Sequence, residues 1–215
     1  MNSFRRAAHV AEREISLELV GGTNAVTALP FVAALVLFAG LGFGPRSEIL
    51  TATAPGLVWI VVIVAALPLA GGVASAERRD DCWDLLRALT RPGEILAGKV
   101  AALWLWLLAC WALATLLSVA LLGAELRPVA LLGGLAGTLG IAVSTVVFGV
   151  LLPDASRRPG MLAVLLPPGV VPVLLAGTQI ATAGVPAWPW LALLLAYDVV
   201  TVTAAWAVFP NLLEE

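Results

Sequence analysis

Six long apolar segments constrain the fold of this chain more than any other feature. A bilayer crossing needs about 20 mostly apolar residues, and only 12% of the residues are charged, roughly half the share in a soluble domain. Inside lipid a crossing must satisfy its own backbone hydrogen bonds, so each crossing is a helix. The sequence therefore predicts an all-α polytopic membrane protein with a single transmembrane domain over residues 1–215. The six predicted spans are Asn24–Phe43, Ala54–Ala76, Ile95–Leu122, Pro128–Leu152, Met161–Thr182 and Trp188–Phe209.

The basic residues predict the orientation of these spans. With the N-terminus inside, only Arg46 and Arg127 of the 12 basic residues fall in outer loops. Cytoplasmic loops carry an excess of Lys and Arg. We therefore expect a multi-pass protein of the bacterial inner membrane, with both termini in the cytoplasm.

The N-terminal segment, residues 1–22, is predicted to be an amphipathic helix on the inner membrane surface. Apolar residues recur there at helical spacing, and basic residues lie off that stripe, where they can meet anionic lipid headgroups. The alternative is a charged leader that only sets the topology. The apolar stripe consists of Phe4, Ala8, Ala11, Ile15 and Leu19.

A second short helix is predicted between spans two and three, over residues 77–93. The segment Glu77–Lys99 holds ten of the charged residues of the chain, of which 12 are basic and 14 acidic. Its apolar face and its mixed-charge face suit a protein groove with complementary charges better than an anionic lipid surface. The alternative is a solvated helix that merely joins two spans. The predicted contact residues are Arg79, Asp80, Asp81, Cys82, Trp83, Leu85, Leu86, Arg87 and Leu89.

Three further patterns lie within the spans. Asp198 is an acid inside the sixth span, where a charge is costly and marks a candidate functional site; the alternative is a structural hydrogen bond, for example to Thr201. Gly133 and Gly137 form a G-x-x-x-G pattern, which permits close packing either within the chain or between copies. We also expect aromatic belts at the membrane interfaces, formed by Trp59, Trp188, Trp190, Trp206 and Phe209.

Motifs for several kinds of chemistry are missing from the sequence. It contains no H-E-x-x-H, no G-x-S-x-G and no P-loop pattern, which are the usual signatures of zinc proteases, serine hydrolases and nucleotide hydrolysis. Its single histidine, His9, lies outside the spans. We expect a membrane subunit that is not itself an enzyme and has no catalytic or metal-binding residues.

Taken together, four sequence segments resemble the CcmB family, the haem exporter protein B of bacterial cytochrome c maturation. These are the charged N-terminus followed by Gly42-Phe43-Gly44-Pro45, the run Ala54–Trp59, the run Glu77–Cys82 ending in Gly98-Lys99, and the pair formed by Leu135–Ile141 and the proline-rich Leu165–Leu175. The resemblance extends over nearly the whole chain. It implies an ABC exporter permease fold with an N-terminal interfacial helix and a cytoplasmic coupling helix after the second span.

The same resemblance implies the partners. ATP would be hydrolysed by a separate CcmA-like ATPase, and a second permease copy, CcmC-like and CcmD-like membrane proteins would complete the assembly. A CcmE-like haem chaperone would be released by the ATPase cycle. Haem and ATP would thus be held by partners, with no cofactor bound directly by this chain, and the surroundings would be membrane lipid, not nucleic acid. In this mechanism the helix Arg79–Arg91 docks in the ATPase and moves spans two and three as a lever.

Other functions remain open from the sequence. The chain could be an ABC permease for another cargo, such as a lipid, a polysaccharide or a drug-like molecule. A proton-coupled carrier that uses Asp198 would work without an ATPase and would be expected to show internal repeats. An intramembrane enzyme ranks last because catalytic patterns are missing.

Overall fold

The computed structural model describes residues 23–44, 46–79, 92–151 and 159–214. Within these ranges the chain forms helices and no strands, which confirms the all-α prediction for the described residues. The helices are α2 (Thr23–Phe43), α3 (Ser47–Arg79), α5 (Pro92–Leu122), α6 (Pro128–Leu151), α7 (Pro159–Ala181) and α8 (Ala187–Glu214).

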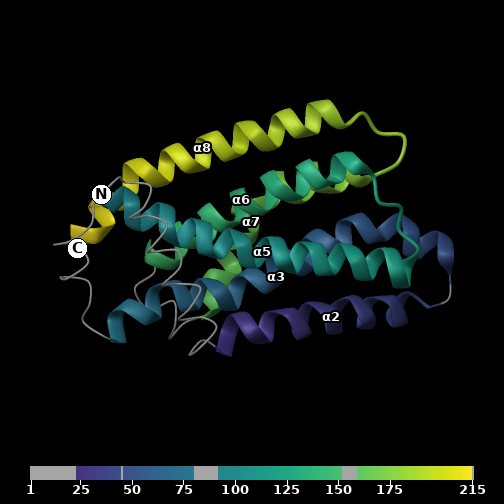
Figure 1. Cartoon of the computed structure of the whole chain (residues 1–215), viewed down its shortest axis with the longest axis horizontal. Helices are drawn as coiled ribbons and strands as arrows, with labels where there is room; N and C mark the ends of the chain where they lie inside the picture. Colours follow the sequence, from purple (N-terminus) through teal and green to yellow (C-terminus); the bar gives the residue numbers. More distant parts are fainter. Residues whose placement is uncertain (1–22, 45, 80–91, 152–158, 215) are drawn as a thin grey trace.

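The described helices lie side by side and alternate in direction (Figure 1). The short connections from α2 to α3, from α5 to α6 and from α7 to α8 lie at one end, which we name the outer end after the predicted orientation. Gly44 and Gly123 follow the last residues of α2 and α5 with positive φ angles of 70° and 68°. Glycine adopts this left-handed conformation without strain, so both residues end their helices at the outer end.

Five of the described helices are long and apolar enough to cross a membrane. These stretches are Ser47–Leu69, Gly93–Leu122, Pro128–Gly149, Ala163–Ala181 and Ala187–Phe209, while α2 contributes the shorter apolar stretch Thr27–Phe43. The chain is a multi-pass membrane protein. A helix is present at each of the six predicted positions, and five of them meet the length and hydropathy of a span.

Helix α6 is central and packs against α3, α5, α7 and α8. Its glycines lie under large side chains of these neighbours. A Cβ atom on Gly134 would lie 2.5 Å from the indole of Trp111 in α5, and one on Gly133 would lie 3.2 Å from Ile180 in α7. In the G-x-x-x-G pattern, Gly133 faces Ile180 of α7 and Gly137 faces Trp59 of α3, so both of its glycines serve packing within the chain.

The prediction that Trp59 belongs to an aromatic belt is wrong. Its side chain is 3% exposed and lies across Gly137 of α6 and Gly177 of α7, both in contact with its indole ring. Phe209, at 1% exposed, is also buried, whereas Trp188 and Trp206 are 80% and 62% exposed. The Trp59 side chain thus packs α3 against both α6 and α7.

Polar side chains add two links between helices. The indole Nε1 of Trp104 in α5 donates to the carbonyl of Leu135, at 3.1 Å, and to the hydroxyl of Thr138. At the outer end, Nη1 of Arg127 donates to the carbonyls of Ile180, Thr182 and Val185, at 3.0, 2.5 and 3.3 Å. Arg127 thus caps the C-terminus of α7, where carbonyl groups lack helical partners and a positive charge is favourable.

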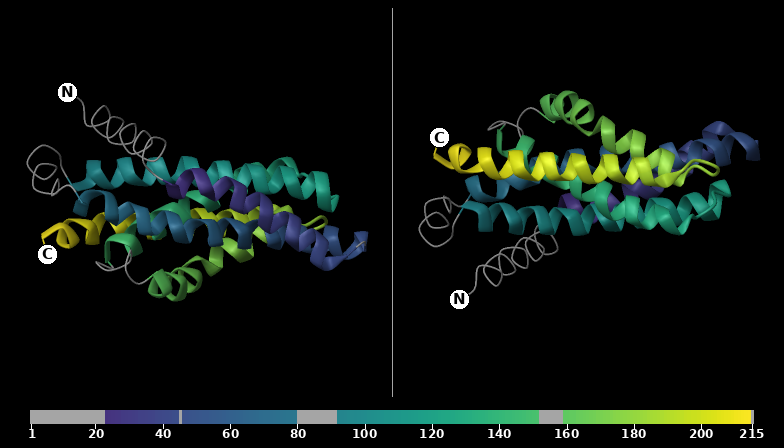
Figure 2. Two further views of the ribbon diagram at one scale, coloured as in Figure 1. Left: turned by 90° about the horizontal axis from the view of Figure 1, so that it is seen from below. Right: turned by 90° about the horizontal axis from the view of Figure 1, so that it is seen from above.

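Helix α7 bends away from the bundle in its inner part. Figure 2 shows the green start of α7 leaning away from the other helices in both views. Pro167, Pro168 and Pro172 lie inside this helix, and a proline inside a helix removes an amide donor and clashes with the preceding turn. The bend of α7 therefore has its physical cause in these prolines.

Two predicted elements lie outside the described residues: the interfacial helix over 1–22 and most of the coupling helix. The helix boundaries correct the expected limits of the latter. The backbone of Glu77–Arg79 belongs to α3, and Pro92 is the first residue of α5, a position at which proline is favourable because its missing N–H has no helical acceptor. A separate coupling helix can therefore occupy at most residues 80–91.

Candidate functional site

The first candidate site is the charged segment between α3 and α5, of which the structure places the two ends. Arg79 is the last residue of α3, while the predicted contact residues Asp80, Asp81, Cys82, Trp83, Leu85, Leu86, Arg87 and Leu89 lie outside the described residues. The charged segment is thus joined at its two ends to α3, which ends at Arg79, and to α5, which begins at Pro92.

The inner turns of α5 are held firmly in the helix bundle. Ile95 and Leu96 are 0% and 5% exposed, and the charged residues Glu94 and Lys99 are also buried, at 8% and 3%. Both residues belong to the charged segment Glu77–Lys99 of the sequence, and no sequence pattern indicated that their side chains are buried. Buried charges are costly to reposition, so α5 is anchored at the point where the charged segment joins it.

The second candidate site surrounds Tyr197 and Asp198, where α6, α7 and α8 meet. The Tyr197 hydroxyl donates to the carbonyl of Gly169 in α7, at 2.9 Å, and lies 2.9 Å from the Ser144 hydroxyl in α6. Because the phenol proton goes to the carbonyl, Ser144 is the donor in the second bond. One hydroxyl therefore joins three helices in the middle of the membrane-spanning region.

Asp198 is buried beside this link, as expected for an acid inside a span. It is 7% exposed, and its Oδ1 atom has no hydrogen-bond partner. The expected bond to Thr201 is wrong, because the Thr201 hydroxyl donates to the backbone carbonyls of Tyr197 and Asp198. A Cβ on Gly140 would lie 2.6 Å from Oδ1, so this glycine of α6 provides the space for the carboxylate.

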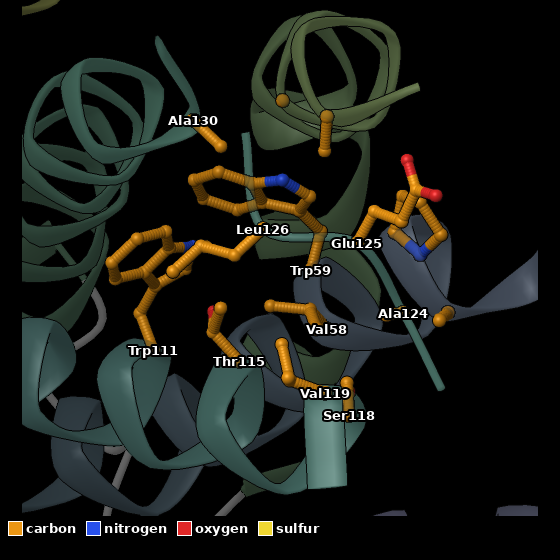
Figure 3. Close-up of a pocket in the computed structure, with 14 residues that line it drawn as sticks. Val58, Trp59, Trp111, Thr115, Ser118, Val119, Ala124, Glu125, Leu126 and Ala130 are labelled. Carbon is orange, nitrogen blue, oxygen red and sulfur yellow. The ribbon is translucent and has the colours of Figure 1, made fainter. Parts of the chain in front are cut away.

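A small cavity lies near the outer end, between α3, α5, α6 and α7 (Figure 3). Its volume is about 40 Å³, and its lining includes Trp59, Trp111, Thr115 and Ser118. That space accommodates roughly three water molecules. The hydroxyls of Thr115 and Ser118 are buried without hydrogen-bond partners. The cavity suits ordered water and is too small for a large organic ligand.

A larger apolar groove of about 290 Å³ runs between α5, α6 and α8. Gly93, Ala97 and Ala101 of α5 form its floor, and Trp104 and Trp206 lie along it. It belongs to the membrane-spanning part of these helices, where lipid chains surround the protein. Among the described residues, there is no cluster of three or more His, Cys, Asp or Glu side chains that could hold a metal ion.

The sequence reasoning found Asp198 but missed Tyr197 and Ser144. A tyrosine next to an intramembrane acid was visible in the sequence, and so was the proline-rich span. The signal that could have joined them is physical: a side-chain hydroxyl in the membrane has no water to bind, so it needs a hydrogen-bond partner within the protein. Which hydroxyl fills this role depends on tertiary packing.

These observations define the class of the chain, a polytopic helical membrane protein with a charged segment between two spans. The chain matches the family described as "CcmB protein" over residues 5–214. It is also 30% identical over 177 residues to "Heme exporter protein B" from Pseudomonas aeruginosa, a match that covers 78% of this chain and 79% of that protein. The chain belongs to the CcmB family.

Proposed function

We propose that this chain is the permease subunit of an ABC transporter that acts in cytochrome c maturation. The observation that carries this proposal is the family match, which includes both helices beside the charged segment and all of α5 to α7. The protein would lie in the bacterial inner membrane with both termini in the cytoplasm, as its basic residues predict. ATP would be hydrolysed by a separate CcmA-like subunit.

In the proposed mechanism, the ATPase binds residues 80–91 through the apolar face around Leu86. Closure of the ATPase pair on ATP displaces this segment, and α3 and α5 follow because they end and begin at Arg79 and Pro92. The buried inner turns of α5 resist local bending, so the displacement reaches the helices packed against α5. Rigid-body shifts of packed helices are a common form of such coupling.

Haem is proposed to be handled mainly by partner proteins. Axial haem ligation uses His, Met, Cys or Tyr side chains, and the whole chain has one His, two Met, two Cys and one Tyr. The Tyr197 hydroxyl is engaged between Ser144 and Gly169. The proposed assembly contains a second permease copy and CcmC-like and CcmD-like proteins, and its ATPase cycle releases a CcmE-like chaperone.

The decisive experiment replaces Leu86 by aspartate in the intact complex. A charge on the apolar face should lower copurification of the ATPase subunit at least tenfold, because a desolvated apolar contact would then hold an unpaired carboxylate. The yield of mature cytochrome c should fall with it. Both quantities are measured in cells that express the variant at the wild-type level.

The matched control is Ala88→Asp, which adds the same charge to the same segment but outside the predicted apolar face. It should retain ATPase binding and cytochrome c yield. Equal behaviour of the two variants, with normal binding in both, would contradict the proposed docking face. A chain that copurifies with no ATPase in its wild-type form would overturn the proposed function itself.

A further inference from the structure

The inner part of α7 is far less embedded in the protein than its outer part. Val164 is 71% exposed, and Met161 and Leu165 are 45% and 43% exposed, whereas Val170, Val173, Ala176 and Ile180 are fully buried. The change falls between Leu166 and Val170, among the prolines of this helix. Helix α7 therefore has an outer part with one face buried in the bundle, where Val171 and Leu175 on the other face remain exposed, and an inner part with few buried side chains.

The Tyr197 hydroxyl lies at this change. Its hydrogen bond to the carbonyl of Gly169 reaches the first residue after Pro167 and Pro168. Its bond with Ser144 ties the same atom to α6, a helix that packs against α3, α5, α7 and α8. The Tyr197 hydroxyl oxygen of α8 thus links the bend of α7 to α6 by hydrogen bonds.

The geometry at Gly169 leaves little room for other contacts. A Cβ there would lie 3.2 Å from the ring of Phe148 in α6, so a larger residue would push α7 away from α6. A helix with proline breaks needs support from its neighbours to hold one conformation. In the part of the chain that the structure describes, the Tyr197 hydroxyl supplies polar support at this bend by its hydrogen bond to the Gly169 carbonyl.

We propose that Tyr197 is a positioning residue for the transport cycle: its hydroxyl holds the α7 bend, and its release lets the inner part of α7 move relative to α6 and α8. The inference rests on the proposed function, because it assigns the movement to the cycle of the permease. A second arrangement of this bend, reached when the hydrogen bond breaks, would make it a two-state element of the kind that transmits a conformational change.

The test measures the position of α7 directly. Spin labels are placed at Val164 on the inner part of α7 and at Val200 on α8, which are 71% and 64% exposed, in a background with Cys82→Ser and Cys110→Ala. The distance distribution is recorded for the purified complex without nucleotide. Tyr197→Phe removes only the hydroxyl, and it should raise the population of a second distance about tenfold, because two hydrogen bonds are lost.

Thr203→Val is the matched control on the same helix, since the Thr203 hydroxyl bonds only to carbonyls of its own helix. It should leave the distribution unchanged. Ser144→Ala, which removes one of the two bonds, should give an intermediate shift, and it keeps the test valid if Tyr197→Phe does not fold. Wild-type distances in both variants would overturn the proposal.

Cytochrome c yield supplies the functional readout. We expect Tyr197→Phe to reduce the yield while the ATPase subunit still copurifies, a separation that loss of the docking face at Leu86 would not give. Altered distances with a normal yield would show that the cycle does not use this bend, and would also overturn the proposal. Because the distance measurement needs no activity, failure of this inference is distinguishable from failure of the proposed function.

Discussion

The outer part of the helix bundle and the inner part of α7 are built in opposite ways. In the outer part, Trp59 lies across glycines of two other helices, and Arg127 caps α7. In the inner part, α7 is bent by prolines and exposes Val164 to 71%. Side chains of different helices therefore interdigitate in the outer part, whereas the side chains of the inner part of α7 are mostly exposed. The comparison assigns close interhelical packing to the outer part of the bundle, and it makes the inner part of α7 the region in which the proposed movement would meet the least packing.

The strongest test of this contrast is Gly177→Ala. The added methyl group would overlap the indole of Trp59, which is 3% exposed and packed among α3, α6 and α7. Overpacking of this kind costs about 1–3 kcal/mol or more, and we expect a loss near the upper end, with a large fall in folded protein. The measurement is thermal unfolding of the purified protein, together with the fraction that elutes as a single species.

Gly42→Ala is the matched control, because a Cβ at Gly42 of α2 meets nothing within 4 Å. Alanine is a better helix former than glycine by about 1 kcal/mol, so the control should be neutral or slightly stabilised. Combining Gly177→Ala with Trp59→Leu should recover part of the lost stability. If Gly177→Ala melts like Gly42→Ala, the interlocked outer region does not exist as described.

The second test is Arg127→Ala, at the outer end of α7. Three carbonyl oxygens would lose a charged donor, and hydrogen bonds of this type contribute about 1.5–3 kcal/mol. We expect a loss of about 2 kcal/mol in stability, measured by thermal unfolding, and faster proteolysis in the loop after α7. Arg46→Ala, at an exposed arginine of the other outer loop, should have no measurable effect; similar losses in both variants would contradict the capping role.

The helices were predictable because an apolar segment in lipid must satisfy its backbone hydrogen bonds within itself. The described helices cover all six predicted positions. Their packing was not predictable. Helix α3 begins at Ser47 instead of Ala54, seven residues earlier, which moves Trp59 about 10 Å further from the start of its helix. The predicted span began at Ala54, whereas the apolar stretch of α3 begins at Ser47, so Trp59 was predicted to lie near a membrane interface although it belongs to the core.

The candidate site around Tyr197 and Asp198 was likewise predictable only in part from the sequence. Asp198 could be found from the sequence because an acid inside an apolar run is rare. The roles of Tyr197 and Gly140 depend on which helices lie opposite each other, and periodicity within one helix carries no such information. The same holds for Arg127, which the positive-inside rule counts as an exception in an outer loop, and which the structure explains as a helix cap.

The smallest effect is expected from Asp198→Asn. This variant tests whether function needs the Asp198 carboxylate or only a side chain of the same size at that position. Oδ1 has no hydrogen-bond partner, so the amide loses no bond that the carboxylate makes there, and it avoids a buried charge that costs at least about 2.5 kcal/mol on insertion scales. We expect stability between unchanged and about 1 kcal/mol higher, because the new amide hydrogens also need acceptors, and a normal cytochrome c yield. Gly140→Ala is the contrasting variant: its methyl group would displace the carboxylate and the Tyr197 ring, 2.6 and 2.7 Å away, so it should destabilise the same site. A well-folded Asp198→Asn protein that no longer supports maturation would instead assign the carboxylate a direct role in the cycle, because its packing and its folding would be intact.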